Sequence, residues 1–277
     1  MESLGTWLRN FDDPPRRQRV LDIGLLTGLR ADPDGSYRLA NFERGLLLDR
    51  IVEIQRPRRV LEIGTGRGLG AFVLAAAGSV YGVELEITTA DIIPLSRPQD
   101  YALEVAGQRE RRQASCEEIW SQHLDPQLRS RITPLTGPTS RTLPRLRKDG
   151  RQFDFVFIDA GHDIYSVAHD LVYAAALLAP GGAVLMDDFA PLEEFGLGTC
   201  VAVSHARRLF SHLEIFPSEG LIYGGATHPE TPRGMVFLSG LRSPVRPRPW
   251  VFPFWRLASA LVTRCYRPSS FPAKLQK

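Results

Sequence analysis

The sequence predicts an α/β fold with a Rossmann-like sheet of seven strands, mostly parallel, and helices on both faces of the sheet. The first observation is that short apolar runs alternate with helical segments over residues 42–211, which is the order of βαβ units and favours parallel strands. The second is a glycine-rich turn, VLEIGTGRG (60–68), between the first apolar run and a helix of small residues. The third is a final pair of apolar runs, at 213–225 and 233–240, which predicts an antiparallel C-terminal strand pair.

Each element follows from its local pattern. Residues 42–55 have helical periodicity and stop before Pro57. Parallel strands are predicted from five apolar runs, at 58–64, 80–86, 131–137, 153–159 and 181–188. Helices are predicted at 68–78, 166–179 and 200–211. Residues 87–130 are less regular, and we expect helices there, including the Arg- and Glu-rich segment 107–120.

The chain divides into three predicted parts. Residues 1–40 mix helical spacing with turn signals and are expected to form an N-terminal helical cap, and residues 41–240 form the domain that carries the site. Residues 241–277 form a tail with eight Lys and Arg residues, no acidic residue, and aromatic residues between the charges. Such a tail could contact a membrane surface peripherally, form a homodimer contact or cover the site, although Pro253 argues against one continuous helix.

The composition excludes several classes of protein. Hydrophobic residues make up 43% of the 277 residues and charged residues 23%, as in soluble globular proteins, and a net charge of +3 does not indicate a nucleic-acid partner. The three cysteines, Cys116, Cys200 and Cys265, have no metal-like spacing and predict no disulfide framework. We find no signal peptide and no run of 18 apolar residues, so a cytoplasmic location is expected.

The glycine-rich turn has two competing interpretations besides a tight turn that binds nothing. Residues 66–71 satisfy the relaxed dinucleotide fingerprint G-x-G-x-x-A, which is a weak signal alone. The turn also resembles the methyltransferase loop E-x-G-x-G-x-G, whose acidic residue suits the cationic S-adenosylmethionine better than a pyrophosphate. The residues that would bind this cofactor are Glu62, Gly64, Thr65, Gly66 and Gly68.

A second acidic residue is expected to hold the ribose of the cofactor. Glu84 ends the predicted strand 80–86, about 20 residues after the glycine-rich turn, where a carboxylate can accept both ribose hydroxyls. Glu86 lies two residues further on the same side of an extended strand, but Glu84 is favoured because it comes first at the strand end. The alternative is that Glu84 is a surface carboxylate.

Four segments together carry a more specific resemblance. VLEIGTGRG, VYGVE, FDFVFIDAGHDIYSV and LLAPGGAVLMDDFAP resemble class I S-adenosylmethionine-dependent methyltransferases, over residues 41–240. The likeness is greatest to the metal-dependent O-methyltransferase branch, with its catechol-type, caffeoyl-CoA-type and natural-product (secondary metabolism) enzymes. This implies a seven-stranded methyltransferase sheet and a divalent metal, Mg²⁺ or Mn²⁺, beside the methyl donor, bound by Asp159, Asp187 and Asp188.

The residues support such a metal site independently. Asp159 ends one predicted strand, and Asp187 and Asp188 end its expected neighbour, so the three side chains should meet in one crevice at the carboxyl edge of the sheet. Three converging carboxylates repel one another unless a cation joins them. Mg²⁺ prefers oxygen ligands and retains open positions.

Other residues have predicted roles in the reaction or in adenine binding. His162 stands where the catechol-type enzymes carry a catalytic lysine, and with Asp159 it is expected to be catalytic, as the base for a substrate hydroxyl; it could instead only hydrogen-bond the loop. Thr139 and Ser140, after the third strand, are expected near the adenine. Trp120 either stacks on the adenine or belongs to the core.

The leading hypothesis is therefore an S-adenosylmethionine-dependent methyltransferase that acts on a hydroxyl of a small-molecule acceptor, with metal assistance. The alternatives are metal-independent N-methylation of an amine or peptide, and a scaffold that binds the cofactor without catalysis. His169 and Asp170 are expected to be surface or packing residues, and Asp163 to lie at a helix start. A nicotinamide enzyme is disfavoured because no hydride-transfer site follows the loop.

Overall fold

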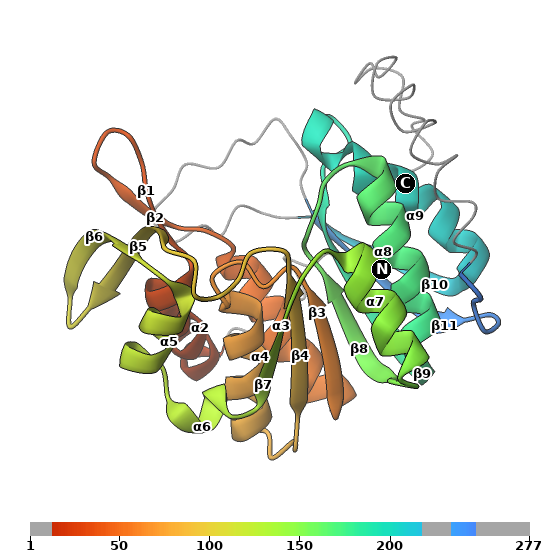
Figure 1. Ribbon diagram of the computed structural model, residues 1–277, viewed down its shortest axis with the longest axis horizontal. Coiled ribbons are helices and arrows are strands. Elements are labelled where there is room, and N and C mark those ends of the chain that lie inside the picture. Colours follow the sequence, from red (N-terminus) through yellow and green to blue (C-terminus); the bar gives the residue numbers. More distant parts are fainter. Residues whose placement is uncertain (1–12, 218–233, 248–277) are drawn as a thin grey trace.

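The computed structural model describes residues 13–217 and 234–247, and its centre is a seven-stranded sheet in the order β10-β11-β9-β8-β3-β4-β7 (Figure 1). The five strands from β9 to the β7 edge are parallel, and β11 pairs antiparallel with both β9 and β10. The strands are β3 Arg59–Ile63, β4 Glu86–Asp91, β7 Ile132–Thr136, β8 Phe153–Ile158, β9 Leu178–Phe189, β10 Phe210–Pro217 and β11 Gly234–Leu241. The predicted fold class is confirmed. Most of the basic aromatic tail, residues 248–277, lies outside the described residues.

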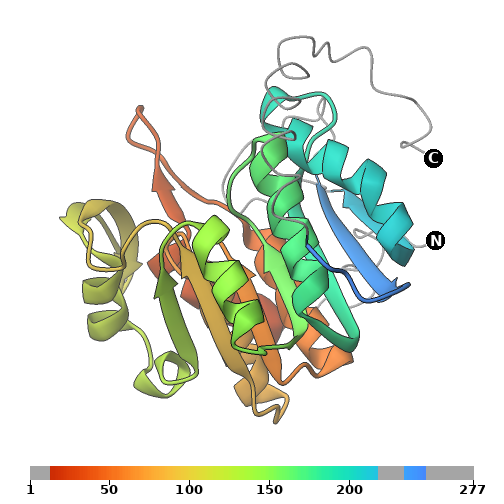
Figure 2. The ribbon, with the colours of Figure 1, turned by 45° about the vertical axis from the view of Figure 1, so that its right-hand side comes forward.

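Helices cover both faces of this sheet (Figure 2). The helices α2 Pro14–Thr27, α3 Phe42–Gln55 and α4 Leu69–Val80 pack on one face, and α7 Thr139–Lys148, α8 Ile164–Leu177 and α9 Leu197–Leu209 pack on the other. Two short helices, α5 Cys116–His123 and α6 Pro126–Arg129, follow the segment after β4. Successive side chains of β3 point to opposite faces, so Val60 joins the first core and Leu61 the second. Burial of these apolar side chains stabilises the layers by about 25 cal/mol per Å².

The register brings the ends of the parallel strands to one edge. Ile63 pairs with Ala90 of β4 on one side and with Ile158 of β8 on the other, and Ile158 pairs with Met186 of β9. The residues that follow these positions therefore emerge side by side from four neighbouring strands. This edge is where ligands bind in open α/β sheets.

The second parallel strand is not where the sequence predicted it. It spans Glu86–Asp91, whereas the apolar segment 80–86 mostly forms the connection after α4. Gly82 has a left-handed φ of 62°, which turns the chain, and Val83 and Leu85 are buried in that connection. Their alternation with polar residues imitates a strand, which explains the error.

Residues 99–114 contradict the prediction of helices. They form an antiparallel hairpin of β5 Gln99–Val105 and β6 Gln108–Ala114. Ala106 and Gly107 both have positive φ, of 51° and 77°, which is the geometry of the two-residue turns that join twisted antiparallel strands. An alanine at the first of these positions gives no turn signal in the sequence.

The N-terminal segment combines the expected helix, α2, with a small hairpin of β1 Leu29–Ala31 and β2 Tyr37–Leu39. Helix α2 is fastened to α3 through a buried ion network around Asp49, whose side chain is 0% exposed. Arg16 Nε lies 2.8 Å from Asp49 Oδ1, Arg19 Nη2 lies 2.7 Å from Oδ2, and the Tyr81 hydroxyl donates to Oδ1 at 2.8 Å. The N-terminal helix therefore shares a core with the sheet and a charge network with α3 and Tyr81.

Candidate active site

The glycine-rich turn connects β3 to α4 through backbone conformations that require glycine. Gly64 and Gly68 have φ of 101° and 98°, a region that side chains other than glycine rarely adopt. A Cβ atom on Gly64 would lie 1.9 Å from the carbonyl oxygen of Asp159. The turn therefore packs directly against the end of β8, and its backbone is open to a ligand at the carboxyl edge of the sheet.

Glu62 is buried beneath this turn, with 1% of its surface exposed. The Thr89 hydroxyl of β4 donates to Glu62 Oε2 at 2.5 Å, and Thr65 Oγ1 lies 2.6 Å from the same hydroxyl. Gly70 of α4 leaves space for the carboxylate, because a Cβ there would lie 2.1 Å from Glu62 Oε1. Burial raises the pKa of Glu62 to about 8, although the Thr89 hydrogen bond and the charge of Arg44 oppose the shift.

A hollow of about 480 Å³ opens beside the turn, between the ends of β3, β4 and β8 and the starts of α7 and α8. Gly64 and Gly66 lie on its wall, and Asp91 at the end of β4 lies next to them. Asp91 is held in place by two backbone groups, because Gly66 N–H donates to Oδ2 at 2.9 Å and Ile93 N–H donates to Oδ1 at 2.8 Å. Sequence reasoning missed Asp91 because it misplaced the strand.

The premise of the Glu84 prediction is wrong. Glu84 precedes β4 and lies near the amino ends of the strands, in an exposed hollow with Arg58, Arg131 and Asp154. The register pairs Arg59 with Glu86 at that edge, so Glu84 is separated from the glycine-rich turn by the whole length of the sheet. The acidic residue at the predicted position in the fold is Asp91.

The far wall of the 480 Å³ hollow contains the polar residues predicted for adenine. Thr139 and Ser140, at the start of α7, line it together with Tyr165 of α8. His169 and Asp170 also line it; they are buried, and His169 Nδ1 lies 2.9 Å from Asp170 Oδ1. The sequence left surface and packing positions open for this pair, and its burial excludes the surface. Burial raises the pKa of Asp170, against hydrogen bonds from His169 and Thr139.

Two further sequence expectations are resolved by the contacts. Trp120 belongs to the core: its ring meets Phe72 edge to face at 4.9 Å, and its Nε1 donates to the Arg67 carbonyl at 3.0 Å. Asp163 caps α8, accepting a hydrogen bond from Ser166 N–H at 3.0 Å.

The three predicted metal ligands converge at the same edge. Asp159 follows β8, Asp187 and Asp188 lie near the end of β9, and one carboxylate oxygen from each lies within 4.8 Å of the others. Burial raises the pKa of Asp159 well above its usual range and also raises that of Asp187, and in both cases the charge of Arg44 opposes the rise.

Arg44, in the first turn of α3, is the principal residue that the sequence did not reveal. Its Nη1 pairs with Asp159 Oδ2 and its Nη2 pairs with Asp187 Oδ2, so one guanidinium joins two strands. Its carbon Cζ lies 5.8 Å from the centre of the Phe157 ring. Burial works to lower the pKa of Arg44, but Asp187, Asp159 and other nearby carboxylates raise it above its usual value.

His162 faces the third carboxylate. Its Nδ1 lies 3.0 Å from Asp188 Oδ2, and 51% of its side chain is exposed. The hydrogen bond to Asp188 raises the pKa of His162, against the effect of burial. Asp188 has a left-handed φ of 60°, which is uncommon outside glycine and directs its side chain away from the path of β9. Phe195 meets the His162 ring edge to face at 6.0 Å.

A divalent cation fits these residues by donor chemistry, since carboxylate oxygens are the ligands that Mg²⁺ and Mn²⁺ prefer. The fit has a condition, because the Arg44 guanidinium already pairs with two of the three carboxylates. A carboxylate oxygen that pairs with the guanidinium binds a metal more weakly, and one that binds a metal pairs more weakly with the guanidinium.

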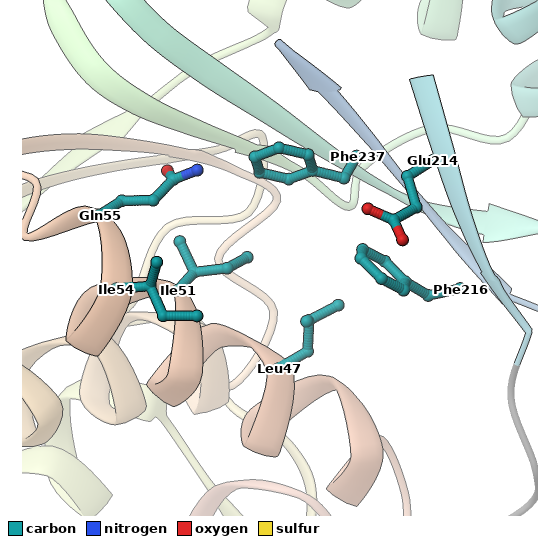
Figure 3. A pocket seen from close by; sticks show the side chains of 7 residues that line it. All are labelled: Leu47, Ile51, Ile54, Gln55, Glu214, Phe216 and Phe237. Carbon is teal, nitrogen blue, oxygen red and sulfur yellow. The ribbon is translucent and has the colours of Figure 1, made fainter. Parts of the chain in front are cut away.

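A second hollow, of about 150 Å³, lies away from this edge, between α3 and the antiparallel strands (Figure 3). Its walls are mainly apolar, with Ile51 from α3 and Phe216 and Phe237 from β10 and β11, and Glu214 is the one charged side chain among the described residues that line it. The described lining therefore offers a single carboxylate rather than a cluster of reactive groups. In the described part of the chain, no helix has both the length and the apolarity to cross a membrane.

Comparison with known proteins agrees with this geometry. Residues 61–189, from β3 to the end of β9, match a protein family described as "Methyltransferase domain". The chain is therefore similar to methyltransferases over this segment. A curated relative, the O-methyltransferase hkm8 of Aspergillus hancockii, is 28% identical over 133 residues. That match covers 48% of this chain and 43% of the relative, less than half of either protein.

Solved structures of methyltransferases share the fold of this chain. An O-methyltransferase from Bacillus cereus in complex with SAH matches with a TM-score of 0.54 and 18% identity, over 84% of this chain and 95% of that one. A methyltransferase from Podospora anserina with SAH bound matches with a TM-score of 0.52 and 16% identity, over 81% and 88% of the two chains. The family match confirms the predicted resemblance to methyltransferases over residues 61–189, and the solved structures confirm the predicted fold.

Proposed function

We propose that this chain transfers the methyl group of S-adenosylmethionine to a hydroxyl group of a small molecule. The observation that carries the proposal is the common edge at which the 480 Å³ hollow, the Asp159 carboxylate and the His162–Asp188 pair meet. A cofactor in that hollow would lie beside a base and a carboxylate cluster. The matching domain and the curated O-methyltransferase relative support the same reaction class.

The hollow offers one partner for each part of the cofactor. The backbone of Gly64 and Gly66 would lie against the methionine part, and the positive charge of its ammonium group would favour ionisation of Glu62, which is buried beneath the turn. Asp91, in place of Glu84, would accept the ribose hydroxyls. Thr139 and the buried His169–Asp170 pair would border the adenine.

His162 would act as the general base. The contact of its Nδ1 with Asp188 favours the tautomer whose Nε2 is the basic nitrogen, so Nε2 would take the proton of the acceptor hydroxyl. The oxygen would then displace the sulfonium methyl in line, with the two substrates held in position by the walls of the site.

Asp159, Asp187 and Asp188 would hold Mg²⁺ or Mn²⁺. When bound, the cation would stabilise the negative charge that develops on the acceptor oxygen. The Arg44 ion pairs give specific support to a second candidate, metal-independent N-methylation of an amine or peptide, because they neutralise part of the cluster without a metal. A cytoplasmic location, a homodimer and peripheral membrane contact through the tail stay predictions of the sequence.

The test compares His162→Ala with His205→Ala, an exposed histidine on α9. Wild-type protein is first screened for SAH formation from S-adenosylmethionine with vicinal diols, catechols, phenols and amines. With the best acceptor, we expect H162A to lower kcat by ~10²–10⁴ and to bind SAH within twofold of wild type by calorimetry. The H205A variant should resemble wild type in both measurements.

Different outcomes separate the candidates. A wild-type rate in H162A would refute the role of His162 as base. Turnover of amines alone would favour N-methylation. SAH binding without turnover of any acceptor in the panel would favour a scaffold that does not catalyse.

A further inference from the structure

The Arg44 side chain is a buried cation in the place that the sequence assigns to a metal. Its guanidinium pairs with Asp159 from β8 and with Asp187 from β9, while Asp188 pairs with His162. All three carboxylates that could hold a metal therefore have a protein partner. The cluster is neutralised in part by the chain itself.

The contacts of Arg44 are those of a specific counter-ion. Its two terminal nitrogens contact different aspartates, which is the forked geometry that guanidinium groups provide and ammonium groups do not. Its Nε is buried and has no hydrogen-bond partner among the described residues. The guanidinium is thus held by the two aspartates and by the Phe157 ring rather than by a complete set of hydrogen bonds.

We propose that Arg44 is an internal counter-ion that competes with a divalent cation for Asp159 and Asp187, so that a metal binds only when the guanidinium moves away. This inference rests on the metal site of the proposed function. It adds that metal affinity is set by a residue that is not a ligand and that lies on another element, α3.

The competition follows from charge and coordination. Mg²⁺ needs near-ideal octahedral ligands at about 2.0–2.1 Å, so it requires the carboxylate oxygens that Arg44 contacts. A guanidinium left beside those oxygens would also repel the cation at close range, where burial weakens screening.

The experiment measures Mn²⁺ binding by water-proton relaxation and by calorimetry on the full chain with SAH bound. The variants are Arg44→Met, which keeps an unbranched stem without the guanidinium group, and Arg50→Met as the matched control. Arg50 lies on the same helix and pairs with Glu53, so its loss changes the net charge equally without touching the aspartates. Circular dichroism and SAH binding verify that each variant is folded.

We expect R44M to bind Mn²⁺ at least tenfold more tightly than wild type, and R50M to bind as wild type does. Binding by R44M where wild type shows none would support the proposal equally. Equal affinities in R44M and wild type would overturn the competition and leave the proposed metal site intact. Absence of Mn²⁺ binding in all three folded proteins would overturn both the competition and the metal site. Methyl transfer and the role of His162 would still be decided by the H162A comparison.

A measurement on the wild-type protein covers the case in which R44M does not fold. Arginine side-chain signals are followed by NMR in ¹⁵N-arginine-labelled protein during a Mg²⁺ titration, and the Arg44 signal is identified by its loss in Arg44→Lys. We expect saturating Mg²⁺ to shift the Arg44 Nε signal and to leave the Arg50 signal in place. An unchanged Arg44 signal with Mg²⁺ bound, or no Mg²⁺ binding at all, would overturn the proposal.

Discussion

Replacement of Glu62 by glutamine should change how the stability of the protein depends on pH. Glu62 is buried below the glycine-rich turn, and its pKa rises from an ordinary value of 4.5 to about 8 because burial disfavours the charged form. The folded state therefore holds this proton more tightly than the unfolded state does. A group of this kind contributes stability that is complete below pH 4.5 and is lost as the pH rises to about 8. Glutamine has the same shape and no proton to lose.

The size of the effect follows from the two pKa values. Each pKa unit corresponds to ~1.4 kcal/mol, so a rise from 4.5 to about 8 corresponds to ~5 kcal/mol over the whole range. Between pH 5.5 and pH 8.5 the loss works out at ~3 kcal/mol. We therefore expect wild type to lose ~3 kcal/mol more than E62Q across this interval.

The assay is urea unfolding of the protein without cofactor or metal, followed by tryptophan fluorescence at pH 5.5, 7.0 and 8.5. The control is Glu86→Gln, an exposed glutamate at the start of β4 whose replacement should leave the wild-type profile unchanged. If wild type and E62Q lose the same unfolding free energy between pH 5.5 and pH 8.5, burial does not raise the pKa of Glu62. That result would refute the reasoning.

Gly64 and Asp91 provide two further tests at the cofactor edge. Gly64→Ala places a Cβ 1.9 Å from the Asp159 carbonyl oxygen and should lower the free energy of unfolding, measured in urea, by ~3 kcal/mol or more. The control Gly35→Ala, at a φ of 83° with no atom within 4 Å, should lower it by only ~1–2 kcal/mol. Equal losses in the two variants would contradict the close packing at Gly64. Asp91→Asn should weaken SAH binding at least tenfold in calorimetry because the ribose loses a charged acceptor, while Glu84→Gln should not, and the reverse pattern would reinstate the original prediction.

The catalytic edge could be predicted because its residues follow strands. Asp159, Asp187 and Asp188 are recognisable since apolar runs end there, and the parallel order of the strands brings such ends together. Gly64 is recognisable because a turn between a strand and a helix needs a left-handed residue. These inferences use only short-range pattern and topology.

The missed residues depend on information that short windows do not contain. Glu84 was chosen over Asp91 because the connection after α4 alternates apolar and polar residues as a strand does. The hairpin at 99–114 has a composition suited to helices and a turn that contains alanine at positive φ. Arg44 lies 115 positions before Asp159, and nothing near it in the sequence distinguishes it from the other arginines.

The ion network between α2 and α3 restricts how the protein can be shortened or recombined. Asp49 depends on Arg16 and Arg19, which belong to the segment that the sequence sets apart as a cap. A shortened chain that begins at residue 41 would lose both arginines that pair with Asp49 and keep the Tyr81 hydrogen bond, so we expect it to be less stable than the full chain. Helix α3, which carries Asp49, also carries Arg44 in its first turn. A hybrid protein with a foreign N-terminal segment would therefore need arginines that pair with Asp49, so that α3 holds Arg44 beside Asp159 and Asp187. When N-terminal segments are exchanged between homologues, the junction should therefore lie before α2 rather than at residue 41.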